Sequence, residues 1–86
     1  MLSRNLANEV AKHGIRVNCI SPASVLTDRM RRQLSDEQQK EVAAMHPLGR
    51  MGTPEDIASA ALFLSSESSS WITGVTLDVA GGRVMI

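Results

Sequence analysis

The sequence predicts an α/β fold with parallel strands, in the order helix, strand, lid helices, helix, strand. Apolar residues recur at helical spacing before Gly14, and a short strand pattern follows that glycine directly. A second strong helix begins at Thr53, and it too is followed by a short strand pattern. A helix that leads into a strand is the second half of a β-α-β crossover, the connection that parallel strands require.

The first helix is expected from Leu2 to His13. Leu2, Leu6 and Val10 fall on one face at helical spacing. Gly14 follows two basic residues, which is typical of a helix end, because glycine adopts the left-handed cap and cations suit the C-terminal end of the helix dipole. Leu2 has no N-cap residue before it, so the chain is expected to continue a helix that begins upstream.

The first strand is expected from Ile15 to Ile20, where alternating residues give way to an apolar run. Pro22 should end it, because proline cannot donate to a strand ladder. Cys19 is interpreted as a small buried residue of this strand. As the single cysteine, it excludes an internal disulfide and fits a reducing, cytoplasmic location.

Two short helices are expected between residues 27 and 44, with a break at Leu34 and Ser35. Ser35 is followed three residues later by Gln38, the spacing of a capping box that opens the second helix. Apolar residues here could line a substrate pocket or could pack the helices onto the sheet, and both interpretations stay open. The residues concerned are Met30, Leu34, Val42 and Met45.

The last helix has the strongest start signal in the chain. Thr53 provides the cap, Pro54 suits the first helical position, and two acidic residues follow. Arg50 is expected to pair with Glu55 or Asp56. Trp71 is expected to pack the serine-rich turn against this helix, and the final strand is expected at residues 76–79.

Composition excludes several classes of function. Basic and acidic side chains number nine each, so the net charge is +0, and binding of nucleic acid by bulk charge is not expected. No apolar run is long enough to span a bilayer, so no membrane partner is expected. His13 and His46 have no acidic or cysteine cluster at ligand spacing, so no metal site is expected.

Four segments of the chain carry motif-like sequences: Gly14–Asn18 (G-I-R-V-N), Ser21–Thr27 (P-G-x-V-x-T), Pro47–Ala58 (P-L-G-R-x-G-x-P-E-[DE]-I-A) and Thr73–Gly82 (T-G-x-x-L-x-V-D-G-G). Each motif alone is weak, but four in register cover essentially the whole chain. Together they resemble the motifs of the short-chain dehydrogenase/reductase family, in the family's own order. The resemblance implies that residues 1–86 are the C-terminal portion of a single Rossmann-like domain with a doubly wound parallel sheet.

The resemblance also implies a cofactor loop for NAD or NADP. Carried over by position, Val25 would contact the nicotinamide carboxamide through its backbone. Thr27 would offer its hydroxyl, and Pro22 and Ala23 would pack against the nicotinamide face. The alternative is an ordinary proline-ended loop with a threonine helix cap. Ala23 and Ala80 replace the family's usual glycine and aspartate.

Other family features are absent from the sequence. It contains no tyrosine, so the family's Y-x-x-x-K acid/base pair cannot form, and nothing matches the phosphate-binding G-x-x-x-G-x-G motif. No catalytic residue is therefore assigned. We expect a C-terminal fragment of an oxidoreductase that acts on a small alcohol or carbonyl substrate as a homo-oligomer. Alone, it should be inactive and should bind no cofactor tightly. The alternative is a non-catalytic association module.

Overall fold

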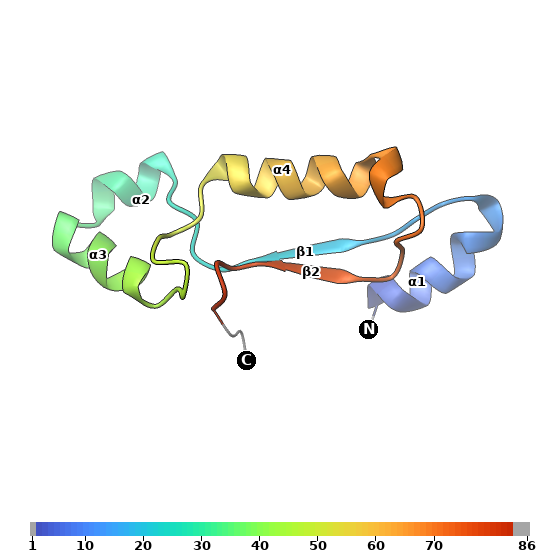
Figure 1. Cartoon of the computed structure of the whole chain (residues 1–86), viewed down its shortest axis with the longest axis horizontal. Helices are drawn as coiled ribbons and strands as arrows, with labels where there is room; N and C mark the ends of the chain where they lie inside the picture. The colour runs from blue at the N-terminus through green and yellow to red at the C-terminus, as the bar shows by residue number, and fades with distance from the viewer. Residues whose placement is uncertain (1, 84–86) are drawn as a thin grey trace.

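The computed structural model describes residues 2–83 (Figure 1). Its two strands pair in parallel, with Cys19 opposite Thr76 and Pro22 opposite Val79, so the predicted α/β class with parallel strands is confirmed. The elements follow the predicted order: α1 (Leu2–Val10), a 3₁₀ turn (Ala11–His13), β1 (Cys19–Pro22), α2 (Asp28–Gln33), α3 (Asp36–Ala44), α4 (Pro54–Ser65), a 3₁₀ turn (Glu67–Ser69) and β2 (Thr76–Val79).

The elements form an elongated arrangement around the strand pair. Figure 1 shows α4 lying along one face of β1 and β2, with α2 and α3 beyond one end of the strands and α1 beyond the other. The described part measures 50 × 24 × 20 Å and has a radius of gyration of 15.6 Å. A compact chain of this length would have a radius of about 12 Å. Much of the surface of each element is therefore left uncovered by the others.

β1 begins at Cys19, so the prediction of a strand from Ile15 was wrong. Just before β1, side chains supply part of the pairing with the segment that leads into β2. Val17 N–H donates to Thr73 Oγ1 at 3.0 Å, and Val75 N–H donates to Asn18 Oδ1 at 3.2 Å. One backbone bond joins the two segments there, from the Gly74 N–H to the Val17 carbonyl at 2.8 Å, and regular pairing begins at the Cys19 N–H, which donates to the Val75 carbonyl at 2.9 Å.

β1 continues through Pro22, two residues past the predicted strand end at Ile20. The Cys19 N–H donates to the carbonyl of Val75, just before β2, and the Ala23 N–H donates to that of Val79, the last residue of β2. Since the N–H groups of a strand alternate in direction, the missing N–H of Pro22 belongs to the edge that faces away from β2. Proline therefore breaks no hydrogen bond of this pair.

The predicted helix ends are confirmed. Gly14 takes the left-handed conformation with φ of 72°, and its N–H donates to the Ala11 carbonyl. Ser35 and Gln38 form the expected capping box of α3. Thr53 caps α4, and Asp56 closes a second capping box that adds an acceptor for the Thr53 N–H.

Few apolar residues are fully buried. Among the described residues the buried apolar side chains are Ala7, Met51 and Ala80. Two expectations of burial were wrong: Trp71 is 98% exposed, and Cys19 is exposed at the start of β1. Neither position has a helix or strand packed over it, and a strand pattern alone does not provide the covering layer.

The half-buried side chain of Arg16 holds the turn between α4 and β2 by hydrogen bonds. Arg16 Nη1 donates to Ser69 Oγ at 3.2 Å and to the Ile72 carbonyl at 3.0 Å, and Nη2 donates to the Ser66 carbonyl at 3.4 Å. These acceptors belong to the turn that joins α4 to β2. Arg16 therefore fixes where the chain leaves α4 and returns to the sheet.

Candidate functional site

The candidate site lies where the carboxyl ends of β1 and β2 meet α2 and α3 (Figure 1). Three segments converge there: the loop after β1, the turn between α3 and α4, and the residues after β2. Ligands of open α/β sheets bind outside the carboxyl ends of the strands. All four predicted site residues lie at this edge, from Pro22 at the end of β1 to Thr27 at the start of α2.

The loop after β1 is held by backbone bonds at several points. Ala23 N–H donates to the Val79 carbonyl at 3.3 Å. Gly52 N–H donates to the Ser24 carbonyl at 2.9 Å, and Leu26 N–H donates to the Gly52 carbonyl at 2.8 Å. The loop is thus tied both to β2 and to the turn that precedes α4.

Val25 forms a parallel bridge with Gly52. The two bonds of this bridge come from the neighbours of Val25, namely the Ser24 carbonyl and the Leu26 N–H. Because polar groups alternate along extended backbone, the N–H and C=O of Val25 itself point away from Gly52. Among the described residues no hydrogen bond occupies either group. Val25 therefore offers one backbone donor and one acceptor on the open side of the loop.

Thr27 caps α2, as the alternative interpretation of this loop held. Its Oγ1 accepts from the Met30 N–H at 3.3 Å. A hydroxyl that accepts one bond keeps its own proton to donate. The cap and a ligand contact are therefore chemically compatible, and the side chain of Thr27 is exposed.

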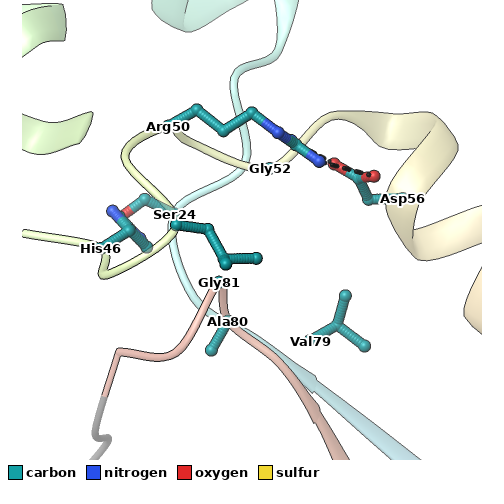
Figure 2. Close-up of a pocket in the computed structure, with 9 residues that line it drawn as sticks. Ser24, His46, Arg50, Gly52, Asp56, Val79, Ala80 and Gly81 are labelled. Carbon is teal, nitrogen blue, oxygen red and sulfur yellow. Dashed lines mark hydrogen bonds and ion pairs between the residues drawn. The ribbon is translucent and has the colours of Figure 1, made fainter.

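A pocket of about 170 Å³ opens beside this loop. Figure 2 shows that its walls come from the loop after β1, the turn before α4, α4 itself and the end of β2. Sequence reasoning assigned no site role to its lining. The lining residues are Ser24, His46, Leu48, Arg50, Gly52, Asp56, Val79, Ala80 and Gly81.

An ion pair spans one wall of the pocket, drawn dashed in Figure 2. Arg50 Nη1 lies 2.7 Å from Asp56 Oδ2, and Nη2 lies 3.3 Å from Oδ1, so the prediction of a pair between Arg50 and one of the two acidic residues is confirmed for Asp56. The Arg50 hydrogen bond, together with that of the Thr53 N–H, holds the pKa of the Asp56 carboxyl far below its usual 3.8. Asp56 is thus a fixed anion that anchors the turn to α4.

His46 is the most deeply buried polar group in the pocket wall, at 3% exposed. Its Nδ1 lies 2.9 Å from the Val42 carbonyl at the end of α3. Because a carbonyl only accepts, Nδ1 carries the proton and Nε2 is an acceptor in the neutral ring. Nε2 is buried and has no hydrogen-bond partner among the described residues.

Sequence reasoning missed Ser24, His46 and Gly81 as neighbours. His46 was weighed only as a metal ligand, and in residues 2–83 no group of three His, Cys, Asp or Glu is placed to hold a metal ion. No described helix has the length and apolar character needed to cross a membrane. Gly81 has φ of +58°, and a side chain there would meet His46 and Leu48, so the glycine signal could have indicated a close approach.

Comparisons with known proteins agree with this geometry. Residues 1–83 match a family model described as enoyl-(acyl carrier protein) reductase. The 3-oxoacyl-(acyl-carrier-protein) reductase FabG of Salmonella typhimurium is 49% identical over 84 residues, which cover 98% of this chain and 34% of that protein. The chain therefore spans about a third of the length of the curated relatives it matches.

Solved structures resemble the chain equally well. A hydroxysteroid dehydrogenase from Escherichia coli superposes with a TM-score of 0.87 at 42% identity, covering 98% of this chain and 35% of that one. A structure described as ElxO with NADP bound gives a TM-score of 0.86 at 29% identity, covering 94% of this chain and 34% of that one. Both share the arrangement of helices and parallel strands described above.

Proposed function

The chain belongs to the short-chain dehydrogenase/reductase family, with the Rossmann-type α/β fold of that family, and we propose that it supplies the nicotinamide-facing loop of an oxidoreductase. The loop is the segment from Pro22 to Thr27. The reaction of such an enzyme is hydride transfer between a nicotinamide dinucleotide and the carbonyl or alcohol carbon of a small substrate.

The open backbone of Val25 carries this proposal. Its N–H and C=O, turned away from Gly52, form a donor and an acceptor side by side, which is the pattern that a primary carboxamide requires. Thr27 adds a hydroxyl proton two residues further on, and Pro22 and Ala23 lie at the strand end. These residues suit the nicotinamide end of a cofactor, which supplies the hydride when bound.

The chain does not hold the rest of the machinery. It has no tyrosine to donate a proton, and no glycine-rich segment to bind pyrophosphate. We therefore assign it no catalytic residue, and we expect the isolated chain neither to turn over a substrate nor to bind a dinucleotide tightly. NADP is a reasonable first cofactor to test, since one matched structure holds it.

A grafted enzyme provides the test. In it, this chain replaces the matching segment of the Escherichia coli hydroxysteroid dehydrogenase, to which it is 42% identical. We expect the graft to bind NADPH or NADH. Val25→Pro, which removes the backbone donor, should weaken binding, whereas Val25→Ala, which keeps it, should not. Equal dissociation constants for the two variants would contradict the role given to Val25.

A second function is favoured by the exposed apolar side chains: association with further copies of the chain or with another polypeptide. Leu2 is 84% exposed and Leu6 is 43% exposed on one face of α1. Leu62, at 72% exposed, lies on α4. Surfaces of this kind mark interfaces in stable proteins. This function needs no cofactor, so the dinucleotide measurement separates it from the first.

A further inference from the structure

In the pocket wall, and within residues 2–83, one buried polar atom lacks a hydrogen-bond donor and one hydroxyl group lacks an acceptor for its proton. His46 Nε2 is a buried acceptor without a donor among the described residues. The Ser24 hydroxyl accepts from Arg83 Nη1 at 3.5 Å, and no described acceptor takes its own proton. Both side chains line the same pocket, as Figure 2 shows. A buried acceptor left unsatisfied is costly, so a donor is expected at Nε2.

Other lining side chains are poor donors to Nε2. Arg50 is the other lining residue with a side-chain donor, and its terminal nitrogens are held by Asp56 and by the Met51 carbonyl. The remaining lining residues are apolar, glycine or acidic. Ser24 is therefore the lining side chain left to donate, and it must do so directly, because Nε2 is buried from water.

We propose that Ser24 and His46 form a relay that ties the cofactor loop to α3, with His46 as a positioning residue. The donors all point one way: Arg83 to Ser24, Ser24 to His46 Nε2, and His46 Nδ1 to the Val42 carbonyl. Ser24 immediately precedes Val25. The relay would thus set the position of the backbone groups to which we assign the nicotinamide, and this part rests on the proposed function.

The relay connects segments that otherwise share few bonds. His46 belongs to the turn after α3, which is joined to the segment that follows β2 by the Leu48 N–H bond to the Gly81 carbonyl. Ser24 belongs to the loop, which reaches the same turn through Gly52. A hydrogen bond between them would close a ring of contacts around the pocket. A displacement of α3 would then shift the cofactor loop, and a displacement of the loop would shift α3.

Ring nitrogen NMR on the grafted enzyme, before any cofactor is added, tests the relay. We expect His46 to hold one tautomer, protonated at Nδ1, with an Nε2 shift typical of a hydrogen-bonded acceptor. Ser24→Ala should move that shift to the value of an unbonded acceptor, and Ser24→Thr should not. A ring that samples both tautomers, or an Nε2 signal that ignores Ser24→Ala, would overturn the relay.

Dissociation constants of NADPH in the grafted enzyme provide a second measurement. The asparagine amide reaches the position of Nδ1, and the glutamine amide reaches that of Nε2. His46→Asn and Ser24→Ala should each weaken NADPH binding several-fold, the double variant should lose no more than either, and His46→Gln should recover most of the affinity. The relay would be overturned if the fold-losses of the two single variants multiplied in the double variant, or if asparagine rather than glutamine restored the affinity. No NADPH binding by the unsubstituted graft would refute the proposed function and leave the NMR result to decide the relay.

Discussion

The Arg50 guanidinium and the Asp56 carboxylate meet at 2.7 Å, and the same carboxylate oxygen accepts the Thr53 N–H at 2.8 Å. One acidic side chain thereby fixes both the start of α4 and the turn before it. The pocket wall depends on this charge, because Arg50 is turned toward Asp56 and the Met51 carbonyl.

Asp56 predicts a loss of stability in acid. Its pKa is lower in the folded chain than the usual 3.8, so the stabilisation is complete above that value and is lost as the pH falls toward the folded pKa. In the grafted enzyme, the free energy of unfolding should fall below pH 3.8 more steeply than in Asp56→Asn, which has no charge to lose. Parallel pH profiles for the two proteins would contradict this.

Arg16→Lys should destabilise the grafted enzyme by about 1.5 kcal/mol, the scale of a hydrogen bond to a charged group. Lysine keeps the charge but not the planar fork that reaches Ser69, Ser66 and the Ile72 carbonyl together. Urea unfolding measures the change. Arg29→Lys on α2, where the side chain is exposed, is the control and should have little effect.

Thr27 and Ser35 are both helix N-caps, but they lie in different parts of the fold. Each side chain accepts one backbone N–H, but Thr27 belongs to the cofactor loop and Ser35 opens α3. Thr27→Ala should weaken NADPH binding by the graft by about 0.5–1.5 kcal/mol, the net value of one hydrogen bond. Ser35→Ala should reduce the free energy of unfolding and leave NADPH binding unchanged. If both variants bind NADPH equally well, Thr27 is a cap and nothing more.

The isolated chain should give no nicotinamide-dependent turnover with any alcohol or ketone. It lacks a tyrosine to donate the proton, and it lacks a glycine motif to bind the phosphates of the dinucleotide. The absorbance of reduced nicotinamide measures this directly. A substrate-dependent change that survives removal of host enzymes would show that another residue of this chain donates the proton.

Local signals made most of the fold predictable. The Ser35 and Thr53 caps depend on residues three positions away, and Gly14 needs only its own freedom at positive φ, so the sequence identified them. Burial was harder to predict, because Cys19 and Trp71 look like core residues but require a covering layer from elsewhere. Alternation alone also could not reveal that side chains supply part of the pairing before Cys19.

For the candidate site too, local features were predictable from the sequence and long-range features were not. The motif predicted a cofactor role for the loop, which stays a prediction, and its four positions run from the end of β1 at Pro22 to the α2 cap at Thr27. Ser24 and His46 are 22 positions apart, and they line the same pocket because Gly52 binds the loop and Gly81 binds the turn. No spacing rule relates residues brought together by two separate backbone bonds. The pocket therefore required the structure.

The exposed face of α1 predicts self-association of the isolated chain. Ala7 is buried against the fold, whereas Leu2 and Leu6 on the same helix remain exposed. With few apolar side chains fully buried and an extended shape, a monomer would leave apolar surface in water. Sedimentation should therefore detect oligomers or aggregates rather than a tight monomer.

Charge placed on that face should reduce the association. Leu6→Lys puts a cation among the exposed leucines, while Asn8→Lys adds the same charge to a different side of α1, where Asn8 is already exposed. We expect the first variant to shift sedimentation toward the monomer and the second to leave it unchanged. Amide exchange in residues 17–20 is the companion measurement, because one edge of β1 has no partner strand among residues 2–83. A monodisperse monomer with slowly exchanging amides in that segment would show that the uncovered surface does not drive association.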